Sequence, residues 1–99
     1  VLRGREAGRV KANVIVINPK DNVAVALEDI TEGAEVRPPG MGPFAAQEKI
    51  PYSHKVALTD ISAGGTVFKY GESIGKALHH IRQGTWVHTH NLAIEEAGS

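Results

Sequence analysis

Two histidines near the end of the chain are its most suggestive candidates for chemistry. They lie in the segment Trp86-Val87-His88-Thr89-His90-Asn91. Side chains alternate along a β-strand, so Trp86, His88 and His90 are expected to share one face. Paired neutral imidazoles suit divalent metals, which favours a ligand, metal or subunit contact at this face. An ordinary exposed strand with incidental histidines is the alternative interpretation.

Polar groups elsewhere could hold a substrate, and each also has a purely structural interpretation. Lys69 could bind a carboxylate and Tyr70 could donate a hydrogen bond, although Tyr70 also fits a packed core aromatic. His54-Lys55 could bind an anion or lie at a solvated strand end. Asp21-Asn22 could reach a polyhydroxyl substrate, yet the pair is typical of hairpin turns. His79-His80 is expected on a solvated face.

The composition narrows the class of protein. The 99 residues predict a single domain, because two hydrophobic cores would leave too few residues for each. Eleven basic residues balance eleven acidic ones, which argues against nucleic acid as a partner. No apolar stretch approaches the roughly 20 residues of a membrane span, and no secretory leader is visible. The absence of cysteine fits a cytoplasmic protein and excludes thiolate chemistry.

The chain contains an internal repeat. Val25–Val36 reads VALEDITEGAEV and Val56–Val67 reads VALTDISAGGTV, with seven of twelve positions identical at an offset of 31. Inside each copy a unit Ile-x-x-Gly-x-x-Val recurs, with Ser53 in the glycine slot of one unit. Glycine would supply the positive φ that ends a turn, and valine would start the next strand on the core side. The spacing predicts two similar halves related by an approximate twofold axis.

The repeat and the local patterns together predict an all-β domain over residues 12–94, with flexible ends at 1–11 and 95–99. Ala12–Ile17 and Asn22–Leu27 should form a hairpin, and Pro38–Pro43 an exposed loop. The remaining expected elements are an ambiguous Phe44–Ile50, a strand Val67–Tyr70 stopping at Gly71, a short helical turn in Ser73–His80, and a last strand Trp86–Leu92.

The repeat also predicts which way the histidines face. Val87 aligns with Val36 and Val67, the expected core positions. Trp86 aligns with the polar residues Glu35 and Thr66. The row formed by Trp86 and the two imidazoles should therefore point away from the core of its own half.

Four motifs in register resemble one known family. They are Asp21–Leu27 (DNVAVAL), His54–Ile61 (HKVALTDI), Lys69–Gly75 (KYGESIG) and Val87–Asn91 (VHTHN). In this order they resemble the N-terminal SAF-type domain of altronate dehydratases, from about Asn13 to Leu92. The resemblance implies a β-clip fold, in agreement with the two halves inferred from the repeat.

The resemblance also implies a function and a partner. It implies a carbon–oxygen hydro-lyase that removes water from an aldonic acid such as altronate, giving a 2-keto-3-deoxy acid. It further implies a divalent metal, iron(II) in this family, and a large subunit or C-terminal domain without which the chain is inactive. On this basis His88 and His90 are the expected metal ligands. The expected substrate-binding residues are Lys69, Tyr70, Asn91, His54, Asp21 and Asn22.

Two alternative functions remain at this stage. The small subunit of a sulfolactate sulfo-lyase shares the layout of motifs. A free-standing SAF-type binding module without a catalytic partner would not need the His88-x-His90-Asn91 ending. The chain could also form a homo-oligomer. No nucleic acid and no membrane are expected as partners.

Overall fold

Nine short strands and no helix make up the part of the chain that the structure describes. The computed structural model describes residues 11–94, so the predicted flexible ends lie outside it except for Lys11. The strands are β1 (Val14–Ile15), β2 (Val23–Ala26), β3 (Glu35–Val36), β4 (Phe44–Ala45), β5 (Lys55–Ala57), β6 (Thr66–Lys69), β7 (Glu72–Ala77), β8 (Trp86–Val87) and β9 (Leu92–Ile94). The all-β prediction is confirmed.

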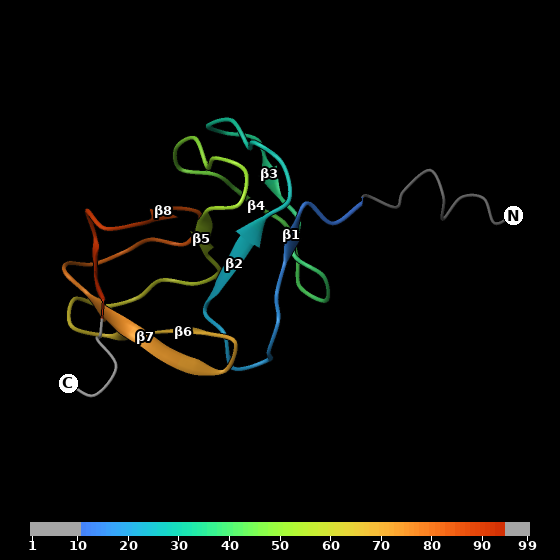
Figure 1. The fold of residues 1–99 in the computed structure, drawn as a ribbon. Helices are drawn as coiled ribbons and strands as arrows, with labels where there is room; N and C mark the ends of the chain where they lie inside the picture. Colours follow the sequence, from blue (N-terminus) through green and yellow to red (C-terminus); the bar gives the residue numbers. More distant parts are fainter. Residues whose placement is uncertain (1–10, 95–99) are drawn as a thin grey trace, which may run out of the picture.

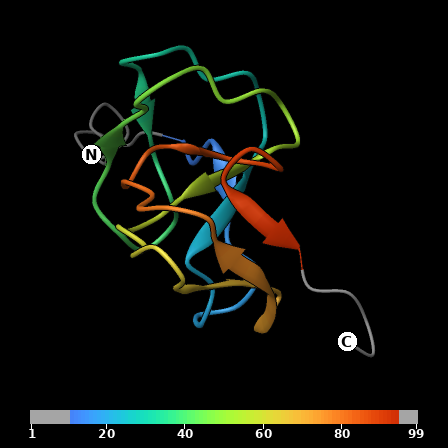
Figure 2. The ribbon, with the colours of Figure 1, turned by 90° about the vertical axis from the view of Figure 1, so that its left-hand side faces the viewer.

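The strands form three antiparallel sheets. The central sheet has four strands in the order β1-β2-β5-β8, and it is flanked by the pair β3-β4 and by the sheet β6-β7-β9. Figure 1 shows the β3-β4 pair above the central sheet and β6-β7 below it. Figure 2 shows β9, in red, beside β7. Nothing in residues 11–94 forms a helix able to cross a membrane.

The four Ile-x-x-Gly-x-x-Val units adopt the conformation that the sequence predicts. The residue in the glycine slot has a positive φ in every unit: 84° at Gly33, 74° at Ser53, 81° at Gly64 and 89° at Gly84. Ser53 therefore takes the backbone conformation of a glycine despite its side chain. The closing valines are all 0% exposed: Val36, Val56, Val67 and Val87.

The two copies make the same hydrogen bonds 31 residues apart. The backbones of Ile30 and Ile50 exchange two hydrogen bonds of 2.9 and 2.8 Å, and those of Ile61 and Ile81 exchange two of 2.7 and 2.8 Å. The carboxylates of Asp29 and Asp60, also 31 residues apart, make equivalent hydrogen bonds. Asp29 accepts from the backbone N–H of Tyr52 at 2.8 Å, and Asp60 accepts from that of Gln83 at 2.9 Å. Val25–Val36 and Val56–Val67 therefore occupy equivalent positions in turn and hydrogen bonding, as predicted. Their burial differs at Leu27, which is 50% exposed, and its counterpart Leu58, which is 6% exposed.

Each half has its own hydrophobic core, which corrects the expectation of a single one. The first core consists of Val14, Ala24, Ala26, Ile30, Val36, Ala46, Ile50, Val56 and Leu58. The second consists of Val23, Ala57, Ile61, Val67, Ala77, Ile81, Val87 and Leu92. The short chain can fill both because β2 and β5 place alternate side chains on opposite faces, one in each core. Val56 lies in the first core and its neighbour Ala57 in the second. The shared strands make the two halves one domain.

Asparagine side chains fix three of the buried valines, a feature that the sequence analysis missed. The amide of Asn22 donates to the carbonyl of Thr66 at 2.9 Å and accepts from the N–H of Phe68 at 2.8 Å, so it spans Val67. Asn13 spans Val36 and Asn91 spans Val87 through the same pair of contacts. We call this arrangement an asparagine bracket. Each bracket satisfies two backbone groups that the short sheets leave unpaired.

The helical turn predicted in Ser73–His80 is wrong, because residues Glu72–Ala77 form strand β7. This strand pairs with β6 on one side and with β9 on the other, and tertiary pairing overrides the helical spacing of its apolar residues. Gly75 lies so close to β9 that an added Cβ would collide with the carbonyl oxygen of Ala93. The β6-β7 hairpin turns at Tyr70 and Gly71, which have φ values of 59° and 77°.

The last predicted strand, Trp86–Leu92, is two strands. Strand β8 ends at Val87, and the chain turns before β9 begins at Leu92. The turn is closed by the backbone N–H groups of Asn91 and Leu92, which both donate to the carbonyl of His88 at 3.0 and 2.9 Å. The histidines therefore lie in a turn and not on a strand.

The other predicted elements are close to the observed ones. The β1-β2 hairpin is confirmed, with Ile15 opposite Val25. The loop Pro38–Pro43 is exposed except for Pro38, which is buried. The ambiguous segment Phe44–Ile50 contains strand β4 and ends in the bridge between Ile50 and Ile30.

The equivalence of the halves predicts equal costs for equivalent core changes. Ile50→Val and Ile81→Val each remove one methylene from a side chain that is 0% or 1% exposed. Each should lower the free energy of unfolding by about 0.5–1.5 kcal/mol. Urea denaturation of the two single variants and of the double variant checks this, and the two costs should add within about 0.5 kcal/mol. Ile17→Val, at a side chain that is 48% exposed, is the control and should stay within about 0.5 kcal/mol of the parent. A large cost at only one of the two core sites would contradict the equivalence.

Candidate functional site

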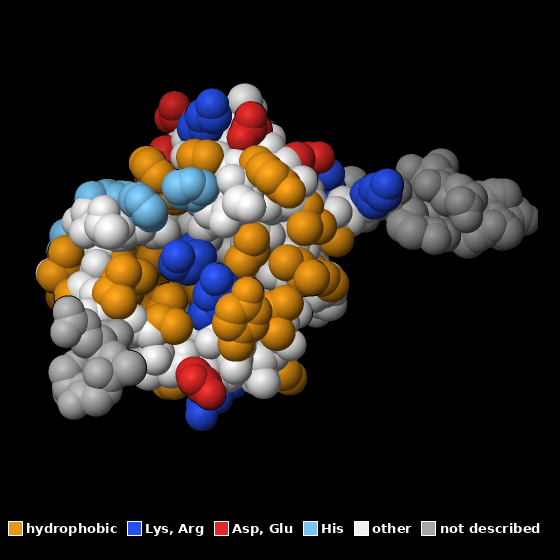
Figure 3. All heavy atoms as spheres, in the orientation of Figure 1, with side chains coloured by type: hydrophobic (Ala, Val, Ile, Leu, Met, Phe, Trp, Pro, Cys, Tyr) orange, Lys and Arg blue, Asp and Glu red, His pale blue; other side chains and the backbone are white. Residues whose placement is uncertain are grey.

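Three imidazoles surround the single tryptophan and form what we call the histidine–tryptophan cluster: His54, Trp86, His88 and His90. The ring of His88 stacks on Trp86 at a centroid distance of 5.4 Å and an interplanar angle of 8°. The rings of His54 and His90 lie 5.5 and 5.2 Å from that of Trp86, both tilted. Figure 3 shows histidine side chains gathered on one face over β8. The sequence prediction that Trp86, His88 and His90 lie on one side is confirmed.

The route to this arrangement differs from the predicted strand alternation. Val87 is buried in the second core, as predicted, so Trp86 does point away from the core of its own half. It is not free in solvent, however, because its indole packs against the first core. His88 and His90 reach the indole because the Asn91 bracket holds the turn, with Asn91 Oδ1 accepting from the backbone N–H of His88 at 2.9 Å.

Hydrogen bonds connect the cluster to two other parts of the chain. The indole Nε1–H of Trp86 donates to Nδ1 of His54 at 3.0 Å. The backbone N–H of Trp86 donates to Oε2 of Glu48 at 3.1 Å. His54 comes from the turn before β5, and Glu48 from the loop after β4. The cluster therefore brings together three segments far apart in the sequence.

Two lysines lie near one another beside the cluster. Lys55, in β5 and directly after His54, pairs with Val87 of β8. Burial and the nearby ammonium of Lys69 hold the pKa of Lys55 below its ordinary value of 10.5. Lys69 also lies over the ring of Tyr70, with 4.7 Å between its Nζ and the ring centroid. In Figure 3 basic side chains over β5 adjoin the histidines over β8.

Three of the predicted substrate-binding residues have clear structural tasks. Asp21 is 8% exposed and its carboxylate accepts from the backbone N–H groups of Asn18 and Gly71, at 3.1 and 2.7 Å. Asn22 and Asn91 form brackets, and Asn91 is 1% exposed. These contacts occupy the polar atoms that a substrate would need. A contact of these three residues with a substrate stays a prediction.

Tyr70 is not the packed core aromatic of the alternative interpretation, since it is 55% exposed in the β6-β7 turn. Its positive φ and the two-residue turn explain why it projects from the domain. Tyr70 and Lys69 are therefore accessible, and their contact with a substrate stays a prediction.

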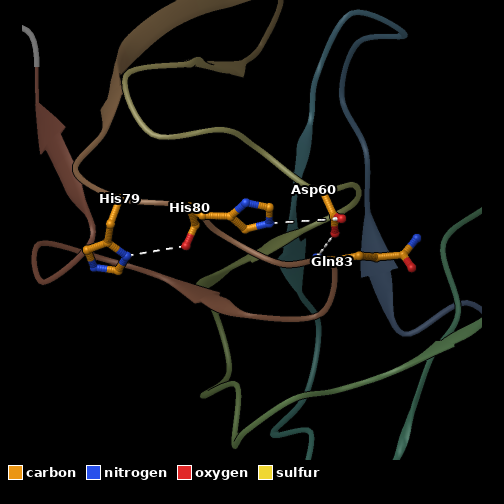
Figure 4. Close-up of polar contacts among 4 residues, drawn as sticks. All are labelled: Asp60, His79, His80 and Gln83. Atoms are coloured by element: carbon orange, nitrogen blue, oxygen red, sulfur yellow. Dashed lines mark hydrogen bonds and ion pairs between the residues drawn. The ribbon is translucent and has the colours of Figure 1, made fainter.

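The other histidine pair lies apart from the cluster. His79 and His80 are exposed, as expected for a solvated face. His80 Nε2 lies 4.0 Å from Oδ2 of Asp60, and Nδ1 of His79 is 3.3 Å from the carbonyl oxygen of His80 (Figure 4). Asp60 already accepts from the backbone of Gln83, and its ion pair with exposed His80 adds little stability.

The described residues do not by themselves fit a metal centre. Within residues 11–94, no three or more His, Asp or Glu side chains are grouped so that they could hold a metal ion. Zinc- and iron-type sites usually take three or more protein ligands. His88 and His90 could supply two of them at most, and the others would have to come from outside residues 11–94.

Sequence reasoning missed Glu48 and the asparagine brackets. No local sequence pattern identifies Glu48, because its contact with Trp86 spans 38 residues. The asparagine brackets do have a local sequence pattern. The dipeptides Asn13-Val14, Asn22-Val23 and Asn91-Leu92 each place an asparagine before a buried apolar residue, and this pattern recurs outside the repeat of 31.

The coupling of the two lysines gives a prediction on the pKa of Lys55. Lys69→Gln removes one ammonium and should raise the pKa of Lys55 toward, but not to, 10.5, since burial remains the larger cause. NMR titration of the Lys55 side chain measures it, with Lys49→Gln, at an exposed lysine, as the control. Because the unfolded chain binds this proton more tightly, stability should rise as the pH rises through the lowered pKa toward 10.5. An unchanged pKa in the Lys69 variant would show that the two ammonium groups do not interact.

Comparisons with known proteins agree on one family. A family model described as the altronate/galactarate dehydratase SAF domain matches residues 12–95. Altronate dehydratase of Escherichia coli K12 is 48% identical over 77 residues, which cover 78% of this chain and 15% of that enzyme. Galactarate dehydratase (L-threo-forming) of the same organism is 39% identical over 84 residues, covering 84% of this chain and 16% of that enzyme. The chain thus spans about one sixth of the length of these relatives.

A third relative is a separate subunit. The alpha subunit of the (2R)-sulfolactate sulfo-lyase of Paracoccus pantotrophus is 52% identical over 48 residues, covering 48% of this chain and 72% of that subunit. The antiparallel all-β architecture agrees with the β-clip that the resemblance implied. The chain belongs to the altronate/galactarate dehydratase SAF domain family.

Proposed function

We propose that this chain is the SAF domain or small subunit of a sugar-acid dehydratase, which removes water from an aldonic acid such as altronate to give a 2-keto-3-deoxy acid. The observation that carries the proposal is the 48% identity to an altronate dehydratase over most of this chain. The accessible histidine–tryptophan cluster supports it, because it presents imidazoles on the surface of an otherwise ordinary β-domain.

The reaction needs more groups than the domain offers. A base must remove the proton at C2, the C3 hydroxyl must leave, and the substrate carboxylate must be held. The cluster and the lysines can bind and orient a sugar acid, but the described residues show no complete set of base, acid and metal ligands. In the proposal, the rest of the active site comes from a larger C-terminal region or a separate large subunit. The difference in length between the chain and its dehydratase relatives supports this division.

A divalent metal, iron(II) by the family resemblance, belongs to the proposal for the whole enzyme. His88 and His90 would be this domain's contribution to its ligands. The metal would act as a Lewis acid on the substrate carboxylate and the neighbouring hydroxyl. Cytoplasmic location and assembly with a large subunit complete the proposal.

The second candidate function is that of the alpha subunit of a sulfolactate sulfo-lyase. The 52% identity over 48 residues to such a subunit favours it, as does the 72% of that subunit that the match covers. Both candidates are lyases that act on hydroxy acids, and a comparison of altronate with sulfolactate as substrate of the assembled enzyme separates them. A non-catalytic SAF-type module is the third candidate.

The first prediction of this proposal concerns the two cluster histidines. His88→Ala and His90→Ala should each lower turnover of the assembled enzyme by about 10²-fold, because each removes a ligand or orienting group. Stability should change little. Loss of the exposed His90 should cost about 0.5 kcal/mol, and loss of the stacked His88 about 1 kcal/mol. Steady-state kinetics of the assembled enzyme and thermal melting of the chain measure the two effects.

The matched controls are His79→Ala and His80→Ala, which alter exposed imidazoles outside the cluster. Both should retain turnover and melting temperature. Strongly lowered melting of the cluster variants would mean that His88 and His90 serve packing. Unchanged turnover in both would place all catalytic groups on the partner.

The second prediction concerns the chain alone. The purified 99-residue chain with iron(II) should not dehydrate altronate at a measurable rate, because the donor set in residues 11–94 is incomplete. Addition of the large subunit or C-terminal region should give turnover. Detection of the 2-keto-3-deoxy product measures both. Robust turnover by the chain alone would be incompatible with a divided active site.

A further inference from the structure

The hydrogen bond between Trp86 and His54 determines where the proton of His54 lies. An indole N–H can only donate, so the Nδ1 atom of His54 that receives it at 3.0 Å must carry a lone pair. A neutral imidazole with a lone pair on Nδ1 has its proton on Nε2. The remaining ring nitrogen of His54 is therefore a hydrogen-bond donor. It cannot serve as a metal ligand or as a base while the bond to Trp86 is kept.

The surroundings of His54 favour an anion as the acceptor of the hydrogen bond that its Nε2–H can donate. Lys55 follows it directly, and the ammonium of Lys69 is near enough to interact with that of Lys55. Neither lysine forms an ion pair with an acidic side chain of residues 11–94. The pair between His80 and Asp60 lies apart from both lysines. Glu48, an acid in contact with the cluster, accepts from the backbone N–H of Trp86. Within the described residues these two cations have no acidic counter-ion, which leaves a local excess of positive charge there.

The rings of His88 and His90 limit the size of a ligand that can approach His54. His88 covers one face of the indole in a parallel stack, and its ring lies 5.1 Å from that of His54. His90 lies against the indole as well, 5.2 Å away. His54 is half-buried at this edge, so its ring has only part of its surface open to a ligand. A small oxyanion fits such a site better than a large apolar group does.

We propose that His54, Lys55 and Lys69 form a carboxylate-binding subsite for a hydroxy acid, in which Nε2–H of His54 donates to a ligand oxygen and the lysines supply the charge. Trp86 is a positioning residue, since it fixes the proton on Nε2 and does not itself contact the ligand. The choice of a hydroxy acid as the ligand rests on the proposed function. The position of the proton on His54 does not.

The first test determines the position of the proton directly. Nitrogen-15 chemical shifts of the His54 ring in the 99-residue chain, at a pH where the ring is neutral, distinguish Nε2–H from Nδ1–H. We expect Nε2–H alone. Trp86→Phe keeps an aromatic ring but removes the donor, and it should allow both neutral forms. An Nδ1–H form in the parent chain, or an unchanged ring in the variant, would overturn the role assigned to Trp86. The spectrum of the parent chain shows the position of the proton on His54 even if the variant fails to fold.

The second test measures binding with gluconate as the probe, a hydroxy acid with one carboxylate. Titration of the chain followed by NMR should give a saturable shift of the His54 and Lys55 signals. His54→Ala and Lys55→Met should each raise the dissociation constant about tenfold, the effect of one hydrogen bond to a charged group. His79→Ala is the matched control and should bind as the parent does. Glycerol, which lacks the carboxylate, should not bind.

The outcomes separate this inference from the proposed function. Saturable binding that depends on His54, in a protein that does not dehydrate sugar acids when assembled, would keep the subsite and reject the dehydratase. Dehydration by the assembled enzyme, with turnover and KM unchanged in His54→Ala and Lys55→Met, would keep the dehydratase and reject the subsite. Equal loss of binding in the His79 control would also reject the subsite.

Discussion

The bracketing of buried valines by asparagine side chains is the interaction on which the rest of the structure depends. Val36, Val67 and Val87 are 0% exposed, and the strands that carry them are only two to four residues long. Such strands leave backbone groups unpaired inside the domain, and an unsatisfied buried group costs about 1–3 kcal/mol. The amides of Asn13, Asn22 and Asn91 satisfy these groups without another strand. The short elements can therefore stay short and still enclose two cores.

Much of the fold could be predicted from the sequence because the repeat records it. The shared valines and isoleucines predict the equivalent core positions, and the glycine slots predict the turns, Ser53 included. The helical turn predicted in Ser73–His80 failed for a reason that lies outside the local sequence. Ile74, Ala77 and Leu78 are spaced as in a helix, and the pairing of β7 with β6 and β9 overrides that spacing. Strand β9 follows the turn that the Asn91 bracket holds, and no local pattern of hydrophobicity shows this bracket.

The residues of the candidate site could be predicted from the sequence better than their arrangement in space. His54, Trp86, His88 and His90 could be named from their types and from the alignment of Val87 with the core valines. Their assembly could not, because the bond between Trp86 and His54 joins residues 32 positions apart, and the approach of Lys69 to Lys55 is also long-range. The alternation argument chose the correct side for His88 and His90, although a turn places them there.

The brackets and shared strands also bear on how the domain folds. Asn22 reaches across 44 and 46 residues to Thr66 and Phe68, so its bracket closes only after most of the chain has collapsed. Val56 of the second copy completes the first core, and Val23, which lies just before the first copy, completes the second. Neither half has its full core before the other is in place. Contacts so distant in sequence slow folding, typically to milliseconds or seconds, and they make it a concerted event. A ribosome releasing this chain would have to deliver nearly all of the domain before any of it became stable.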